Sequence, residues 1–367
     1  MTSDLKVGGF SILPTISTGI ETTTNLEGDP TEKSGYIGQL LGSISASKTL
    51  EDLFINTSLS LQQQEPIDAD AINSTALSGL INTNYQINDA WSIQGELEYD
   101  ESIVTTTDPY QFSGNVNGVT STESAVLGFT WTGKKYSAQV LGRIQDVATE
   151  TSVTGSTASE LDRVERDIRF QISRNLSDGK FYTYGGVTEI DYADSGIDRN
   201  SEGVLLGIGR SWTGKTYSIT TEFGALWQRF LTDLIPINRG IVGQLEGTVA
   251  LTDNWTLGAK AARSFEEQNI ATNSAGLYIN ELSVGLQTLL HDDLLLRFGP
   301  TYTVSEFDNE NFELDTYMLD ATLMWQIMPN LQMPVVISYL TQEANNAALA
   351  ASEFNELSLT ISLVKAF

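Results

Sequence analysis

The chain of 367 residues contains no cysteine, which excludes a disulfide, a thiolate metal site and a cysteine nucleophile. Its one histidine, His291, lies in a predicted turn beside Asp292, so we expect a solvated residue there and no catalytic triad or multi-histidine metal site. The sequence also lacks a Gly-x-Ser-x-Gly elbow and a phosphate-binding glycine loop. We therefore expect no enzymatic activity, no cofactor and no resident metal.

Long apolar runs and basic residues are scarce as well. No run of 18 or more apolar residues occurs, which excludes a transmembrane helix. Only 20 residues are Lys or Arg against 47 Asp or Glu, giving a net charge of −27. Because nucleic acids and anionic headgroups bind clustered Lys and Arg, this composition argues against both as partners. The first residues, MTSDLKVGG, lack the basic and apolar regions of a signal peptide, so none is expected.

What the sequence does contain is alternation of apolar and polar residues, seen most clearly in Ala90–Tyr99. One parity holds Trp91, Ile93, Gly95, Leu97 and Tyr99, and the other holds Ser92, Gln94, Glu96 and Glu98. A period of two indicates a β-strand with one apolar face. An aromatic ring at both ends of the apolar face is typical of a strand that crosses an outer membrane.

About eighteen segments of this kind follow one another, and short turns alternate strictly with longer polar loops. The pattern predicts an all-β protein in which residues 1–367 form one transmembrane antiparallel up-and-down β-barrel. We expect about 18 strands, with 16 as the alternative, and both termini periplasmic. A soluble sandwich, solenoid or propeller also has many strands, but its strands are usually shorter.

Aromatic residues support the membrane interpretation, because they gather beside the short turns. The predicted interfacial girdle consists of Trp91, Trp131, Tyr136, Trp212, Tyr217, Trp255 and Trp325. The sequence Trp131-Thr-Gly-Lys-Lys-Tyr-Ser recurs as Trp212-Thr-Gly-Lys-Thr-Tyr-Ser, either as repeated hairpin chemistry or as two independent glycine turns. The terminal Phe367 closes an alternating strand and is predicted to be the assembly signal read by the outer-membrane insertion machinery.

The polar parity of the strands predicts a hydrophilic, acidic lumen. Its charged residues are predicted to line the pore: Glu21, Glu96, Glu98, Arg143, Arg163, Glu165, Asp167, Arg169, Glu189, Asp191, Glu222, Glu246, Lys260, Glu281, Arg297, Asp320 and Glu356. Such rings select which solutes pass, and an acidic lumen should repel polyanions. Alternatively, the charges pair across strands and fill the barrel. Both interpretations are open from sequence. In the strand that carries Glu189 and Asp191, the apolar face is predicted to be Tyr182, Tyr184, Ile190 and Tyr192.

Two predicted loops carry chemistry of their own. Ser102–Ser121 is long enough to fold into the pore, where Tyr110, Phe112 and Asn115 would suit sugar binding. The acidic stretch from Asp308 to Asp315 could hold Ca²⁺, but it lacks the glycine and spacing of a known calcium loop. A solvated acidic loop is the preferred interpretation.

The N-terminal segment Gly9-Phe-Ser-Ile-Leu-Pro-Thr-Ile-Ser-Thr-Gly-Ile20, followed by Asn25 and Glu32–Ile37, resembles the opening of the putative β-barrel porin 2 group. The chain has Thr23-Thr24 where that group is expected to have an acidic pair. Members are outer-membrane barrels associated with exopolysaccharide export. The resemblance implies passage of a hydrophilic polymer handed over by periplasmic or inner-membrane export components.

The first functional hypothesis is thus a bacterial outer-membrane pore that exports an exopolysaccharide through an acidic lumen. The second is a general or solute-specific diffusion porin for small neutral or cationic solutes. A barrel enzyme and a structural or adhesin-type barrel are the other classes. The expected partners are the lipid bilayer with its lipopolysaccharide, the insertion machinery, export components and the polysaccharide itself, and no nucleic acid.

Overall fold

The computed structural model describes residues 5–25, 34–67, 74–104, 118–151, 162–193, 199–266, 276–307, 313–345 and 353–367. Strands and their connections make up these residues, which contain no helix and hence none that could cross a membrane. The strands are β1 Leu5–Val7, β2 Phe10–Thr23, β3 Gly35–Leu50, β4 Leu53–Pro66, β5 Ser74–Asn88, β6 Trp91–Val104, β7 Gly118–Thr132, β8 Tyr136–Thr151, β9 Arg163–Leu176, β10 Gly179–Tyr192, β11 Ser201–Thr213, β12 Tyr217–Phe230, β13 Asn238–Ala250, β14 Trp255–Glu266, β15 Leu277–His291, β16 Leu294–Phe307, β17 Glu313–Met328, β18 Leu331–Ala344 and β19 Phe354–Ala366.

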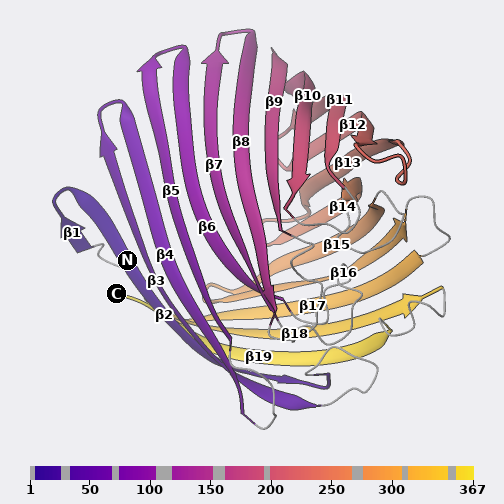
Figure 1. Ribbon diagram of the computed structural model, residues 1–367. Helices are drawn as coiled ribbons and strands as arrows, with labels where there is room; N and C mark the ends of the chain where they lie inside the picture. Colours follow the sequence, from indigo (N-terminus) through magenta and orange to yellow (C-terminus); the bar gives the residue numbers. More distant parts are fainter. Residues whose placement is uncertain are drawn as a thin grey trace.

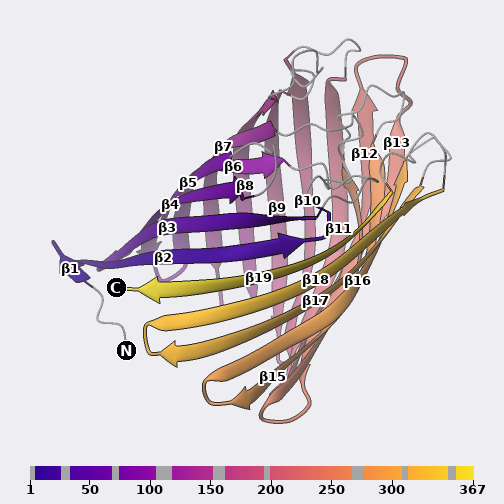
Figure 2. The same ribbon diagram turned by 90° about the horizontal axis from the view of Figure 1, so that it is seen from below.

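Strands β2 to β19 form one closed antiparallel ring, in which each strand pairs with its neighbours in sequence. The last strand, β19, pairs with β2, so the sheet has no open edge (Figures 1 and 2). The ring has the 18 strands that the sequence predicted. Closure matters because a membrane offers no water to satisfy the backbone groups of an open edge.

Short turns join the strands at one end of the barrel, which we call the turn end; the opposite end, with the longer connections, is the loop end. All of the predicted short turns are confirmed, among them the repeated Gly133 and Gly214 hairpins. In each hairpin the glycine N–H donates to the carbonyl of the tyrosine three residues later, at 2.8 Å, which supports repeated hairpin chemistry.

At the turn end of the seam, the start of β2 and the end of β19 lie side by side (Figure 1). The backbone N–H of Phe367 donates to the carbonyl oxygen of Pro14 at 3.0 Å. Pro14 was expected at a seam or bulge because it lacks a donor N–H, and it lies on the seam strand β2. The short strand β1 was not predicted from sequence. It pairs with the start of β2, and a turn at Gly8 and Gly9, both with positive φ, joins the two strands.

The outer face of the barrel is apolar over most of each strand. Its exposed side chains include Leu97, Leu127, Ile168, Val204 and Phe223, which share one face of the sheet through the strand register. Such exposure would be unfavourable in water, whereas in a bilayer these side chains contact lipid. The exposed large hydrophobic residues of the strands therefore mostly face outward.

Candidate functional site: the inner wall of the barrel

The inner wall carries the polar parity of the strands. The register places the following predicted pore residues on this wall: Glu21, Glu96, Glu98, Arg143, Arg163, Glu165, Asp167, Arg169, Glu222, Glu246, Lys260, Glu281, Arg297, Asp320 and Glu356. Serine, threonine, asparagine and glutamine fill most positions between them. Pore lining itself stays a prediction, since no solute is bound.

Strands β8 and β9 carry a connected cluster of ion pairs on this wall. Asp167, whose side chain is only 3% exposed, accepts from Arg143 Nε at 2.5 Å and from Arg169 Nε at 2.8 Å. Glu165 accepts from Arg163 at 2.8 Å and from Arg143 at 3.4 Å. Three arginines and two carboxylates, all predicted from sequence, thus pair with one another, as the pairing interpretation expects.

Carboxylates elsewhere on the wall accept hydrogen bonds from neutral side chains. Asn82 donates to Glu96 at 2.8 Å, and Gln39 donates to Glu21 at 2.6 Å. Thr23 donates to Glu356 at 2.9 Å. These donors fix the carboxylates without cancelling their charge, so the wall keeps its acidic character.

Two hydrophilic hollows lie on the inner wall. The first, about 400 Å³, spans β12 to β15 and is lined by hydroxyl side chains and by Glu246 and Lys260. Lys260 donates to Glu281 at 2.8 Å beside it. The second, about 280 Å³, spans β7 to β10 near the turn end and is lined by hydroxyls, amides and Lys180. Both offer neutral hydrogen-bonding groups, beside Glu246 and Lys260 in the first hollow and beside Lys180 in the second.

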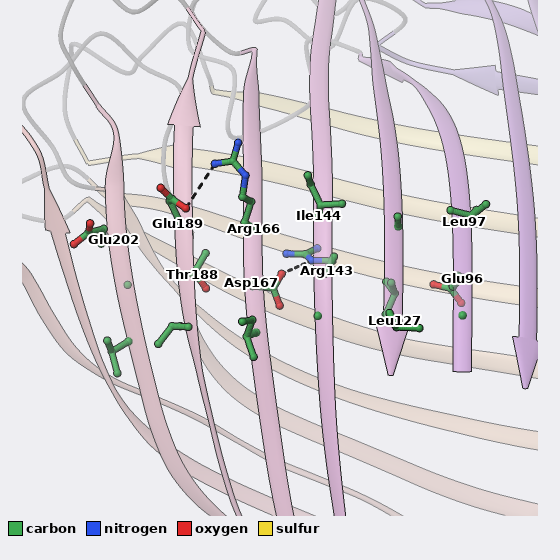
Figure 3. Close-up of a pocket in the computed structure, with 18 of the residues that line it drawn as sticks. Glu96, Leu97, Leu127, Arg143, Ile144, Arg166, Asp167, Thr188, Glu189 and Glu202 are labelled. Carbon is green, nitrogen blue, oxygen red and sulfur yellow. Dashed lines mark hydrogen bonds and ion pairs between the residues drawn. The ribbon is translucent and has the colours of Figure 1, made fainter. Parts of the chain in front are cut away.

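One strand faces the opposite way from the prediction. Val187 of β10 pairs with Ile168 and Val204, which are exposed on the outer face, so Glu189 and Asp191 also face outward. Figure 3 shows Arg166 and Glu189 pointing toward each other, and they pair at 3.6 Å. The next residue of β9, Asp167, pairs with Arg143 on the other face.

The inward assignment of Glu189 and Asp191 is therefore wrong. They lie above the apolar band, where Arg166 binds Asp191 at 2.5 Å, and Glu189 and Glu202 line the edge of an outer groove of about 1050 Å³ across β5 to β11. The prediction placed the tyrosines of β10 on the lipid face. Because neighbouring residues of a strand point to opposite faces, this assignment reversed the predicted face of every residue in β10.

The tyrosines of β10 belong to the inner wall, which the sequence analysis missed. Tyr182 reaches across β11 and donates to Glu222 of β12 at 2.6 Å. A Cβ on Gly209 would lie 2.3 Å from the Tyr182 ring, and one on Gly207 would lie 2.3 Å from Tyr184. The alternation of glycines in β11, opposite two tyrosines, is the sequence signal that could have revealed this packing.

A second feature missed by the sequence analysis is an arc of buried apolar side chains that face inward at the loop end of β10 to β19. We call it the loop-end collar, and it consists of Tyr192, Phe230, Leu277, Phe307, Leu314 and Phe354. Leu314 is 0% exposed and Leu277 is 1% exposed, although both lie on the wall of a wide barrel. The inner wall on this side of the loop end thus holds apolar groups that other atoms of the protein cover, in contrast to the polar wall nearer the turn end.

The predicted aromatic girdle lies where expected in the sheet. Trp91, Trp131, Tyr136, Trp212, Tyr217, Trp255 and Trp325 all share the outward parity beside the turn end, and Trp91 pairs directly with Trp131. A second set near the loop end comprises Tyr36, Tyr99, Trp227, Tyr302, Tyr317 and Tyr339. Eight residues separate Trp91 from Tyr99, about 26 Å of strand, which is of the order of the apolar band of such barrels.

Several sequence predictions concern residues that the structure does not describe, or residues that lie apart from the inner wall. Tyr110, Phe112 and Asn115 belong to a stretch that the structure does not describe, as does most of the acidic segment after Asp308. His291 is exposed at the end of β15, as expected. Among the described residues, no group of three or more His, Cys, Asp or Glu side chains could hold a metal ion.

Solved structures with a similar fold include three transporters. They are the FrpB iron transporter from Neisseria meningitidis (8% identity, TM-score 0.53), the copper transporter OprC (11%, 0.52) and the outer membrane transporter YddB from Escherichia coli (10%, 0.51). The alignments cover 91%, 93% and 92% of this chain but only 62%, 62% and 61% of the three transporters, so they show the fold alone. No curated protein matches the chain significantly.

A family model matches almost the whole chain. The model is described as Putative beta-barrel porin 2, and it matches residues 3–366. It agrees with the closed ring, the polar inner wall and the apolar outer face, and with the resemblance seen in the first hairpin. The chain is therefore a bacterial outer-membrane protein that belongs to the putative beta-barrel porin 2 family.

Proposed function

We propose that the barrel is a conduit for a hydrophilic, largely uncharged polymer such as an exopolysaccharide. The observation that carries this proposal is the chemistry of the inner wall. Arginine and carboxylate side chains on β8 and β9 pair with one another, while hydroxyl and amide groups line the hollows between the charges. A wall of this kind exchanges hydrogen bonds with sugar hydroxyls without holding the polymer by a strong charge.

Size and polarity of the hollows fit this role. Volumes of about 400 and 280 Å³ are of the scale of one or a few sugar rings, and each hollow offers several donors and acceptors. Weak binding at several sites is what conduction needs, because a permeant must enter each site and also leave it. Periplasmic or inner-membrane components would deliver the polymer at the turn end.

A diffusion porin for small neutral or cationic solutes is the second candidate. The family description favours it, since it names a porin and no polymer. The loop-end collar favours the first candidate, because a mouth lined by buried apolar side chains suits a gated conduit better than an open pore.

Two measurements together test the proposal. Deleting the gene should abolish surface polymer and leave growth on small sugars intact, and the purified barrel in planar bilayers should conduct weakly. Replacing Phe307 and Leu314 of the collar by Ser should raise the conductance, whereas replacing the outward Leu319 and Ile337 by Ala should not. Normal surface polymer in the deletion strain, together with high conductance of the unaltered protein, would favour the diffusion porin instead.

A further inference from the structure

The outer face changes from apolar to charged toward the loop end of most strands. We call these charged outward residues the outer rim. On β4 to β8 it is acidic, with Glu65, Glu101, Glu123 and Asp146, and on β16 to β18 it is again acidic, with Glu306, Asp315 and Glu343. On β12 to β14 the outward charged residues of this half of the barrel are Arg229, Arg239 and Arg263, with Arg263 nearer the turn end because it pairs with Gly243. Three of the 20 basic residues thus gather on three consecutive strands of a strongly acidic protein.

The three arginines share the outward face with the lipid-facing side chains. Arg239 pairs in register with the exposed Trp227, and Ile241 next to it on the same face is 69% exposed. Arg263 pairs with Gly243, two positions from Leu245 on that face. The connection between β12 and β13 adds Leu234 and Ile237, which are 64% and 51% exposed.

The ion pairs that the arginines of this patch form with carboxylates of the protein are exposed. No described residue forms an ion pair with Arg239, which is exposed. Arg229 meets Glu202 at 3.4 Å, with both side chains more than 60% exposed. Arg263 is more engaged: it meets Glu306 at 3.1 Å, donates to Asn280 at 2.5 Å and lies 4.3 Å from the centroid of the Tyr278 ring. Exposed pairs of this kind contribute little, so a doubly charged phosphate can compete for the guanidinium groups.

From this arrangement we infer that Arg229, Arg239 and Arg263 bind the phosphates of an acylated phosphoglycolipid, the chemistry of the lipid A part of lipopolysaccharide. In barrels of this class the longer loops face the outside of the cell, which puts the loop end at the outer leaflet. Guanidinium groups bind phosphate through paired N–H donors, while acyl chains would cover the apolar face around Ile241. Overall composition argued against anionic headgroups as partners, but the fold concentrates the few cations in one place.

The test uses the purified full-length barrel in detergent and native mass spectrometry with added lipid. Bisphosphorylated lipid A should bind the unaltered protein and bind R239Q about tenfold more weakly, and R229Q/R239Q/R263Q should lose binding. R174Q is the matched control, because Arg174 is an exposed outward arginine of β9 at the turn end, and it should bind like the unaltered protein. R239Q removes a side chain with no ion pair among the described residues, so its folding should be normal.

Two further probes distinguish a phospholipid-type ligand from a soluble phosphate and test whether the phosphates are needed for binding. Fully dephosphorylated lipid A should bind weakly to every variant, and inorganic phosphate alone should not displace the lipid. Equal binding of the triple variant and the unaltered protein would overturn the inference, as would equal binding of the dephosphorylated lipid. Displacement by millimolar inorganic phosphate would assign the patch to a soluble anion and likewise overturn the lipid assignment.

Discussion

Gly179 starts β10 with a φ of +146°, a conformation that residues with a side chain rarely adopt. A Cβ built there would lie 1.9 Å from the carbonyl oxygen of Ser211. We expect G179A to lower the free energy of unfolding by about 2 kcal/mol or more, from backbone strain and the clash together. Urea unfolding of the lipid-embedded barrel, followed by tryptophan fluorescence, measures the change. G142A is the control: nothing lies within 4 Å of its added Cβ, and it should unfold like the unaltered protein.

A comparison of Asp167 with Asp191 tests how burial changes the contribution of an ion pair to the free energy of unfolding. Asp167 is 3% exposed and accepts from two arginines, whereas Asp191 is 40% exposed and pairs with Arg166 on the outer rim. Replacing Asp167 by Ala leaves Arg143 partly buried and without this partner, which should destabilise the barrel by about 3 kcal/mol. D191A should have a small effect, because water and salt screen an exposed pair. Equal effects in the same unfolding assay would contradict this ranking.

At the scale of whole strands, the seam between β2 and β19 closes the ring by joining the first and last strands of the barrel. Phe367 lies outside the final strand on its outward parity, with Lys365 Nζ 4.7 Å from its ring centroid. If this residue is the assembly signal, F367A should insert slowly into vesicles that contain the insertion machinery. It should still refold in detergent, where no machinery reads the signal. A refolding defect in detergent alone would indicate a structural role instead.

The short turns and most strand faces could be predicted from sequence because both depend on local patterns. Gly133, Gly214 and the alternation in Trp91–Tyr99 act within a few residues. Strand β10 was inverted because its tyrosines looked apolar, and only the glycines of β11 and the distant Glu222 make their inward position favourable. Tyrosine combines an apolar ring with a polar hydroxyl, so parity alone does not decide which face it takes.

The loop-end collar could not be predicted for a related reason. Phe307 and Leu314 are apolar residues on the otherwise polar inward face of their strands. They lie near the strand ends, where a sequence pattern cannot distinguish a strand from a loop. Phe307 pairs in register with Leu277 of the preceding strand, so these two collar residues meet only when β15 and β16 pair. The arginine patch has the same origin, since Arg229, Arg239 and Arg263 become neighbours only when β12, β13 and β14 pair.

For the molecule as a whole, the distribution of charge between the two faces governs what the pore admits. Acidic side chains outnumber basic ones on the inner wall, and Glu96 and Glu222 accept hydrogen bonds only from neutral donors among the described residues. Closed walls of low dielectric strengthen the field of such charges inside the lumen. The barrel should therefore attract small cations and repel small anions even though much of its wall is neutral.

Reversal potentials in a KCl gradient across a planar bilayer measure this preference. The experiment uses the F307S/L314S collar variant, whose current is expected to be large enough to measure. This variant should prefer K⁺ over Cl⁻. Selectivity should fall when the salt rises from 0.1 M to 1 M, because the screening length shrinks from about 10 to about 3 Å. Adding E96Q and E222Q should bring the preference close to unity, whereas D191N, which alters an outward carboxylate, should leave it unchanged. Unaltered selectivity in the E96Q/E222Q protein would mean that the pore field comes from other carboxylates of the wall.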